Sequence, residues 1–424
     1  MGKKTLTSKL PTLCYGCGTC AGVCPNDAIV MSEYEKKGIF LPVMNETRCN
    51  SCGLCLQVCP WEFLDKDELS AFVFHRRSKG ILGNYLRCYL GCSTDKKLER
   101  EGSSGGLVST LLTFALEEGI IDGALVTRMS DKEPLLPEPF IATTKSEVIS
   151  ATGSKYIPIP LNIVLKQIQS RKGKYAVVGL PCHIQGIRKA ELINKKLNDK
   201  IVLHLGLFCT GTISRYGTDI LLRSLNVDYE NIAKICYREG SWPGGFEVLL
   251  KDGTTTPVLP YKRYFSIIRS YFPLSCFPCW DLLNDFSDIS FGDMWTDHAP
   301  PAPKKGATLA ISRTEKGEEL LKAAASKASI TLEQISPQQV FEAQDRSISF
   351  KSGNLAIRCA LIRLVSKESP NFRNIVSPEN SGFDYVSTIK TLLLFSRCLL
   401  MSNLATRSII NHFLVHLLKS GVRR

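Results

Sequence analysis

Apolar residues in the middle of the chain fall into short runs that are separated by stretches with helical spacing. Tyr175–Gly179 and 200–209 are apolar runs that predict buried strands. Between them Pro181 makes a turn, and Ile184 and Ile187 begin a pattern with the spacing of a helix. A strand, a helix of about 15 residues and a second strand form a βαβ unit, so we expect two parallel, adjacent strands.

The same alternation of elements occurs earlier in the chain. An apolar stripe over residues 107–116 predicts a helix that follows a Ser/Gly turn. Gly119 ends this helix, and Ala124–Thr127 is the next predicted strand. A polar join near Asp65–Glu68 separates this region from the N-terminal segment. We therefore expect an α/β domain over residues 66–345.

The composition is that of an ordinary globular protein, except for its cysteines. The chain has 424 residues, 44% hydrophobic and 22% charged, which suits about two or three domains. Its polar start is unlike a signal peptide, and no apolar run approaches the roughly 18–20 residues that span a bilayer. Seventeen cysteines without secretory signals indicate reduced thiols that hold metal. We therefore expect a cytoplasmic protein without a disulfide framework.

Eight of the cysteines form an internal repeat near the N-terminus. The run Cys14-x-x-Cys17-x-x-Cys20-x-x-x-Cys24-Pro25 recurs 35 residues later as Cys49-x-x-Cys52-x-x-Cys55-x-x-x-Cys59-Pro60. This is the bacterial two-cluster ferredoxin pattern, in which the fourth cysteine of each run ligates the other cluster. It predicts one 4Fe-4S cluster on Cys14, Cys17, Cys20 and Cys59, and a second on Cys49, Cys52, Cys55 and Cys24. Zinc is the alternative for C-x-x-C pairs, but two identical four-cysteine runs favour iron–sulfur clusters and a separable module over residues 1–65.

Four further cysteines are predicted to meet at one edge of the central sheet. Cys182 follows the first strand of the βαβ unit, and Cys209 ends the second. Because parallel neighbouring strands end at the same edge, where α/β sheets bind ligands, both thiols can meet there. Cys276-Phe-Pro-Cys279 supplies two more ligands, so we expect a third 4Fe-4S cluster. The alternatives are a zinc site on the same four residues and a nucleophilic Cys182-His183 pair.

Two segments could bind a phosphate-containing cofactor. Ser104, Gly105 and Gly106 stand at a predicted helix start, where backbone N–H groups bind phosphate. Ser154, Lys155 and Tyr156 add phosphate donors and an aromatic ring. The alternatives are an ordinary helix start for the first segment and a surface loop for the second.

Taken together, the motifs resemble one known family. "SSGGLVSTLLTFALEEGIIDGALV", "GSKYIP", "VVGLPCHIQGIRK", "GLFC", "CFPCWD" and "ISFGDMW" occur in the order found in the beta subunits of coenzyme F420 hydrogenases and dehydrogenases. The resemblance covers roughly residues 80–330, and a ferredoxin pair precedes it, as in several members. It implies an FAD and a 4Fe-4S cluster in the central domain, with a flavin that exchanges hydride with a substrate. It also implies that the two phosphate-binding segments contact the FAD.

The C-terminal residues lie outside these motifs. From Lys351 onward there are 11 Lys/Arg and 3 Asp/Glu, so residues 346–424 form a basic, helical C-terminal extension. Packing onto the body or onto a partner is one interpretation, and peripheral contact with an anionic membrane is the other. We expect no specific nucleic acid.

These patterns predict an α+β two-cluster ferredoxin module, an α/β flavin-binding domain and a basic helical tail. The predicted function is that of an iron–sulfur flavoprotein oxidoreductase, which exchanges electrons with ferredoxin or a partner subunit and hydride with a small molecule. The alternatives are a flavin-free electron-transfer subunit of a larger complex and a basic nucleic-acid-binding protein with structural zinc. The motifs identify no catalytic acid or base.

Overall fold

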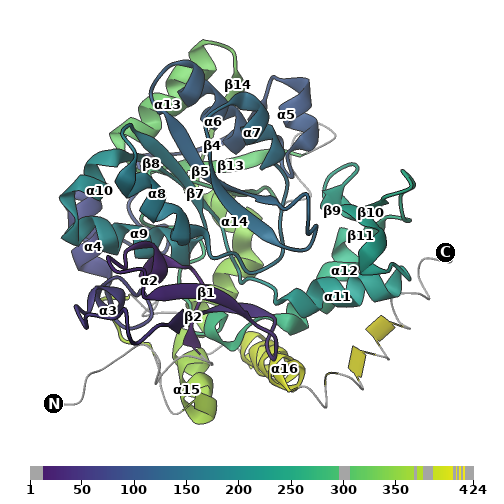
Figure 1. The fold of residues 1–424 in the computed structure, drawn as a ribbon. Coiled ribbons are helices and arrows are strands. Elements are labelled where there is room, and N and C mark those ends of the chain that lie inside the picture. The colour runs from purple at the N-terminus through teal and green to yellow at the C-terminus, as the bar shows by residue number, and fades with distance from the viewer. Residues whose placement is uncertain are drawn as a thin grey trace.

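A mixed eight-stranded sheet forms the centre of the molecule in the computed structural model (Figure 1). The structure describes residues 13–295, 306–366, 370–375 and 385–403, and positions 407, 410, 411, 414 and 415. In spatial order the strands are β14 (Ile330–Ile335), β4 (Arg87–Ser93), β13 (Thr308–Ser312), β12 (Ile289–Asp293), β8 (Ile201–Leu207), β7 (Tyr175–Gly179), β5 (Gly123–Met129) and β6 (Pro137–Ala142).

The predicted βαβ unit is confirmed. β7 and β8 are parallel neighbours, and α9 (Pro181–Ile193) and α10 (Lys195–Lys200) connect them. β12 and β5 extend the parallel part of the sheet on either side, whereas the outer strands pair antiparallel. Parallel strands need a crossover connection, which the helices provide. The carboxyl ends of β7 and β8 therefore lie side by side.

Helices cover both faces of the sheet because its strands are apolar on both sides. Ala124 and Val126 face one buried cluster and Leu125 faces another, as the alternation of side chains along a strand requires. The first face carries α6 (Leu107–Glu117), α7 (Lys145–Ser150) and α13 (Glu315–Ser326), with α5 (Lys96–Glu101) beside them. The second carries α4 (Lys66–Phe74), η2 (Leu161–Val164), α8 (Leu165–Ser170), α9 and α14 (Pro337–Ile348).

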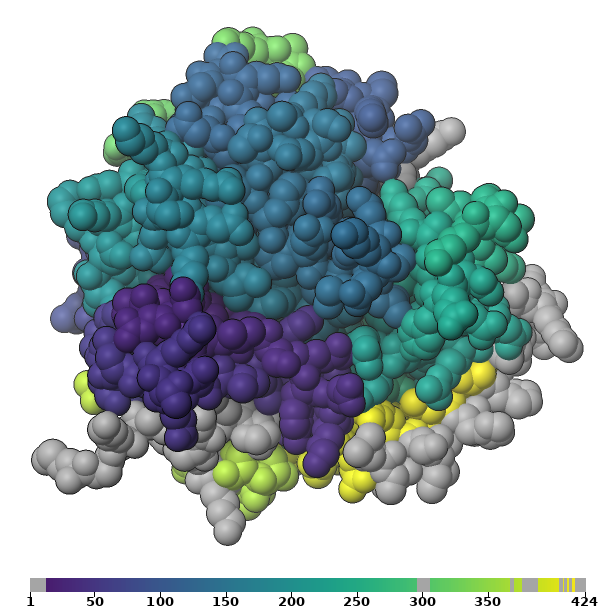
Figure 2. Space-filling view, in the orientation of Figure 1, coloured from purple at the N-terminus to yellow at the C-terminus, as the bar shows by residue number. Residues whose placement is uncertain are grey.

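The N-terminal cysteine segment packs on η2, α8 and α9, which cover the second face. It contains α2 (Thr19–Gly22), α3 (Leu54–Gln57) and the antiparallel hairpin of β1 (Ile29–Tyr34) and β2 (Ile39–Met44). The backbones approach so closely that a Cβ on Gly186 would lie 2.2 Å from Thr19 Oγ1, and one on Gly22 would lie 2.0 Å from the Asn162 carbonyl oxygen. The segment is purple in Figure 2, against the blue-green body. It is therefore closely joined to the central domain.

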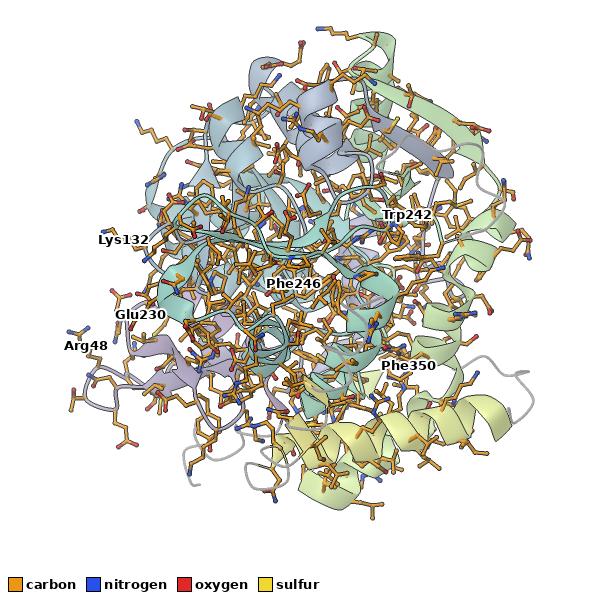
Figure 3. The ribbon with its side chains drawn as sticks, turned by 90° about the vertical axis from the view of Figure 1, so that its right-hand side faces the viewer. Arg48, Lys132, Glu230, Trp242, Phe246 and Phe350 are labelled. Carbon is orange, nitrogen blue, oxygen red and sulfur yellow. The ribbon has the colours of Figure 1, made fainter. Side chains whose placement is uncertain are left out.

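A second lobe is inserted between β8 and β12, and the hydrophobic pattern did not predict it. It contains α11 (Arg215–Ser224), η3 (Tyr229–Asn231), β9 (Ile232–Glu239), β10 (Gly245–Leu250), β11 (Leu259–Pro260), α12 (Tyr261–Ile268) and η4 (Arg269–Tyr271). Its helices and three-stranded sheet stand to one side of the large sheet in Figure 1. Phe246, buried in the lobe's core, is labelled in Figure 3.

The C-terminal extension is packed onto the body over the residues described. A π turn (Ser349–Gly353) leads from α14 into α15 (Leu355–Ser366), and β15 (Phe372–Arg373) pairs parallel with β3 (Leu64–Asp65). α16 (Tyr385–Ser402) buries Phe395, Cys398 and Met401 in the core of the lobe. Part of the basic tail lies outside the described residues. Among those described, no helix has the length and apolar character to cross a membrane.

Candidate iron–sulfur sites and flavin loop

Cys24 lies beside the first three cysteines of the second run, as the ferredoxin pattern predicts. Cys24, Cys49, Cys52 and Cys55 line one cavity of about 160 Å³. The Ala28 N–H donates to Cys24 Sγ at 3.3 Å, and the left-handed Gly53 (φ 76°) begins α3 between Cys52 and Cys55. Cys52 is exposed, so this set lies toward the surface. Arg48, beside it in the chain, points outward at the edge of the molecule in Figure 3.

The other four cysteines of the repeat gather in the interior. Cys14, Cys17, Cys20 and Cys59 line a second cavity of about 50 Å³. Burial is the largest cause that raises the pKa of all four thiols, and neighbouring thiols contribute to the rise at Cys14, Cys20 and Cys59. The pKa of Cys59 is about 11 as a result. Four buried thiolates would repel one another without a cation between them. Donor type, spacing and cavity therefore fit a metal cluster.

The four central cysteines meet at the carboxyl edge of the sheet. Cys182 is the second residue of α9, directly after β7, and Cys209 lies two residues beyond β8. Cys276 ends η5 (Leu274–Cys276), and Cys279 follows on the same loop. Burial, with a smaller contribution from Cys279, raises the pKa of Cys209 to about 12 and that of Cys276 to about 11. The same influences raise the pKa of Cys182. The donor set suits a cluster, and the ligand role of these residues stays a prediction.

The thiol spacing bears on the zinc alternative. In the part of the chain that the structure describes, no three His, Cys, Asp or Glu side chains come close enough to hold one metal ion. Zn–S bonds of about 2.3 Å require the four thiols to lie within about 4 Å of one another. Among the described residues, the thiols are therefore not arranged as the ligands of one metal ion.

His183 does not form a catalytic pair with Cys182. Its Nδ1 accepts the Leu180 N–H at 3.1 Å, and its Nε2 lies 2.9 Å from the Ile159 carbonyl oxygen, to which it donates as a neutral ring. Burial lowers its pKa to about 4. Both ring nitrogens are therefore engaged with the backbone, and the histidine holds the start of α9.

Tyr15 lies between the buried N-terminal set and the central set. It lines the cavity of the N-terminal set, and its ring contacts Trp61 edge-on at 5.4 Å between centroids. Burial raises the pKa of its hydroxyl, and thiols of both sets, among them Cys279 and Cys59, raise it further. The ring therefore stands where it feels the charge of both thiol sets.

Asn162 ties the same two regions together by hydrogen bonds. Its N–H donates to the Cys17 carbonyl oxygen at 3.0 Å. Its Nδ2 donates to Thr19 Oγ1 at 2.8 Å and to the His183 carbonyl oxygen at 2.9 Å. Thr19 Oγ1 in turn lies 3.3 Å from Cys17 Sγ. All of these groups are buried, so the loop of one thiol set and the helix of the other are fixed to each other.

The two predicted flavin segments also meet. Ser154 N–H donates to Ser103 Oγ at 2.8 Å, and the two hydroxyls are 2.9 Å apart. Gly106 (φ 72°) is the residue before α6, and Gly105 (φ 76°) precedes it. A Cβ on Gly105 would lie 2.9 Å from that of Cys92, so packing of the chain itself requires this glycine. A bulky residue at Gly105 would therefore disturb the fold as well as any ligand.

Lys155 and Tyr156 make contacts within the protein. Lys155 Nζ donates to the carbonyl oxygens of Ala151, Thr152 and Gly153 at 2.9–3.1 Å, just beyond α7. Burial lowers its pKa to about 8. The Tyr156 ring packs on Phe265 and Tyr237, with centroids 5.3 and 5.4 Å away. These two residues therefore shape the loop and anchor it to the lobe.

Arg238 was not predicted from the sequence, although it connects the lobe to the loop of Ser103 before α6. Its guanidinium is 3% exposed, pairs with Asp293 at 3.0 Å and donates to the Ser103 carbonyl oxygen at 3.2 Å. It also lies over the rings of Tyr261 and Trp295. Trp242, labelled in Figure 3, contacts Trp295 with centroids 4.9 Å apart. An arginine in a strand gives no local signal, since its partners lie 55 and 135 residues away in sequence.

The two N-terminal cysteine runs and the families that the chain matches define an iron–sulfur oxidoreductase. Residues 13–63 match the family described as 4Fe-4S dicluster domain. Residues 88–166 and 172–338 match the N-terminal and C-terminal parts of the coenzyme F420 hydrogenase/dehydrogenase beta subunit. The chain belongs to the family of coenzyme F420 hydrogenase/dehydrogenase beta subunits.

Individual relatives agree with this assignment. The coenzyme F420 hydrogenase subunit beta of Methanothermobacter thermautotrophicus is 31% identical over 250 residues, which cover 58% of this chain and 83% of that protein. An F(420)H(2) dehydrogenase subunit of Methanosarcina mazei is 29% identical over 72% of this chain and 81% of its own. A chain in the solved F420-reducing NiFe hydrogenase complex of Methanosarcina barkeri is similar with a TM-score of 0.53 and 26% identity, covering 67% of this chain and 95% of that one.

Proposed function

We propose that this protein passes single electrons between a redox carrier protein and a bound FAD, which exchanges hydride with coenzyme F420 or another small molecule. The proposed division is a ferredoxin module (1–65), a flavin and cluster domain (66–345) and an extension (346–424), in the cytoplasm. The observation that carries the proposal is the series of three four-cysteine sets, from an exposed one through a buried one to one at the sheet edge. Relatives named as hydrogenase and dehydrogenase subunits support it.

The proposed order in which electrons pass the three cysteine sets follows from how exposed each set is. Bound 4Fe-4S clusters would each carry one electron, and bound FAD would convert between one- and two-electron chemistry. Cys52 brings the outer set to the surface, where a carrier protein or partner subunit can approach. The second set is buried behind it, and Tyr15 and Asn162 join that set to the central one. Burial keeps water away from the two inner sets.

The flavin would lie at the start of α6. Backbone N–H groups at the beginning of this helix, at Gly105 and Gly106, would bind phosphate, with the Ser104 and Ser154 hydroxyls beside them. Lys155 and Tyr156 would shape the site through their contacts with α7 and the lobe. The aromatic side chains around Arg238 would border it on the side of the lobe.

Metal and flavin content test the proposal. Protein purified without oxygen should hold about twelve irons per chain, three clusters of four, together with flavin. Cys279→Ala should lose about four irons and keep the flavin, because the predicted flavin residues lie elsewhere. Its flavin should no longer be reduced through the ferredoxin clusters, while reduction by a hydride donor persists.

The opposing outcomes are distinct. Eight irons in the wild-type protein, or no loss in Cys279→Ala, would remove the third cluster. Twelve irons without flavin would leave the flavin-free electron-transfer subunit as the function. Comparing reduced coenzyme F420, NAD(P)H and reduced ferredoxin as reductants of the flavin identifies the substrate class.

A further inference from the structure

The C-terminal extension places two buried cations beside the central cysteines. Lys351 is 1% exposed and Arg358 is fully buried. Both lie beyond residue 338, where the match to the C-terminal part of the beta subunit ends. Lys351 belongs to the π turn between α14 and α15, and such turns are frequent at functional sites. A buried positive charge costs free energy unless a negative group faces it, so these two charges require a partner.

Arg358 binds the loop that carries two of the central thiols. Its Nη1 donates to the Cys279 carbonyl oxygen at 3.0 Å and to that of Phe277, and its Nη2 donates to that of Lys351. The Phe350 ring, labelled in Figure 3, lies under the guanidinium and contacts Phe277 edge-on. The extension therefore holds the Cys276–Cys279 loop through Arg358 and Phe350.

Lys351 lines a small cavity together with the buried Asp281 and Asp285. Within the ranges that the structure describes, neither Lys351 nor Arg358 lies within ion-pair distance of Asp or Glu. The acceptors of Arg358 are neutral carbonyl oxygens. Burial raises the pKa of the Cys209 and Cys276 thiols, and Lys351 is the largest influence that lowers it. Arg358 Nη1 is bound to the Cys279 carbonyl oxygen and Arg358 Nη2 to that of Lys351, so both buried cations stand against the loop that carries Cys276 and Cys279.

We propose that Lys351, supported by Arg358, raises the reduction potential of the cluster bound by the central cysteines. The inference rests on the proposed function, because it assumes that cluster. When one electron arrives from the carrier protein, the cluster becomes more negative by one charge and no bond is made or broken. A buried cation stabilises the more negative state, and net charge near a cluster is one determinant of its potential. The extension would thus make the last cluster a better electron acceptor.

Lys189 offers a matched control at a different cluster. Its Nζ donates to the Cys59 carbonyl oxygen at 2.9 Å and to that of Phe63. It is 9% exposed and acts electrostatically on the Cys59 thiol of the buried N-terminal set. Lys189 and Lys351 are therefore two buried lysines, each beside a different thiol set.

The experiment is a redox titration of the full-length protein, followed by electron paramagnetic resonance without oxygen. In Lys351→Met the equilibrium constant for reduction of the central cluster should fall about tenfold, a shift of about 59 mV to lower potential. The other two clusters should be unchanged, and Lys351→Arg should keep the wild-type value. Lys189→Met should instead shift the buried N-terminal cluster. The signal of the central cluster is identified by its loss in Cys279→Ala.

Iron content separates the outcomes. Eight irons in the wild-type protein overturn the proposed function itself. Twelve irons with an unchanged central potential in Lys351→Met overturn this inference and leave the proposed function intact. Lys351→Gln, which is also neutral, is titrated in parallel, so that a potential is measured even if the methionine variant loses iron. An equal shift in Lys351→Arg would also overturn the inference, because charge would not be its cause.

Discussion

At the residue scale, His183 shows how a polar side chain supports a thiol site without taking part in its chemistry. His183 is 4% exposed. Its Nδ1 accepts the Leu180 N–H, and its Nε2 donates to the Ile159 carbonyl oxygen. This arrangement needs a neutral ring, because a protonated Nδ1 could not accept the Leu180 N–H. Cys182 is its neighbour, so the position of that thiol depends on an uncharged histidine.

Acid should therefore destabilise the protein through His183. The pKa of about 4 in the folded protein lies below the ordinary 6.5, so the unfolded chain binds more protons as pH falls through this window. The neutral imidazole contributes to the free energy of unfolding above about pH 6.5, and about 2 kcal/mol of this contribution should be lost between pH 7 and pH 5. Urea unfolding at the two pH values measures this difference. His183→Gln should reduce it, and His75→Asn, at an exposed position, should leave it unchanged.

At the element scale, the sequence predicted those features that depend on residues close together in the chain. Cysteine spacing predicted the two N-terminal sets, and the ends of β7 and β8 predicted where Cys182 and Cys209 meet. The lobe was missed because apolar and polar residues do not alternate regularly along β9 and β10, and β11 has only two residues. Arg238 was missed for a different reason, since its role is set by partners that only the fold brings near.

The lobe should control flavin binding through Arg238. In Arg238→Met, Asp293 loses its buried partner and the Ser103 carbonyl oxygen loses a donor. Breaking a buried pair costs about 3–5 kcal/mol, so we expect flavin affinity to fall at least tenfold. The flavin-to-protein ratio after gel filtration measures this. Arg128→Met, which breaks a partly exposed pair with Glu138, should keep its flavin. Full flavin content in Arg238→Met would place the cofactor away from this loop.

At the scale of the whole molecule, the N-terminal segment and the central domain form one connected structure. The sequence predicted a separable module, yet the contacts of Asn162, Gly186 and Lys189 cross between the two parts. The close approach of Gly186 to the Thr19 side chain and of Gly22 to the Asn162 backbone leaves no room for the parts to slide past each other. The relative position of the two inner thiol sets is therefore set by packing, and so is the path between them.

Removing the Asn162 side chain should loosen this connection. Asn162→Ala leaves Thr19 Oγ1 and the His183 carbonyl oxygen without their buried donor, at a cost of about 1–3 kcal/mol. Hydrogen exchange of residues 17–22 and 183–187 should therefore rise about 10–100-fold. Asn26→Ala removes an exposed hydrogen bond to the Arg48 carbonyl oxygen and is the control. Unchanged exchange in Asn162→Ala would mean that packing alone joins the parts.

The pairing of β3 with β15 has a consequence for biosynthesis. Leu64 pairs with Phe372, and the Leu64 N–H donates to the Asn371 carbonyl oxygen. Residue 64 leaves the ribosome long before residue 372, and at about 5–20 residues per second the interval is on the order of tens of seconds. During that time β3 has no partner strand, and the Trp61 ring lacks its edge-on contact with Phe372. The segment that carries Cys59 is therefore made early but receives its last strand pairing only after the C-terminal extension has left the ribosome.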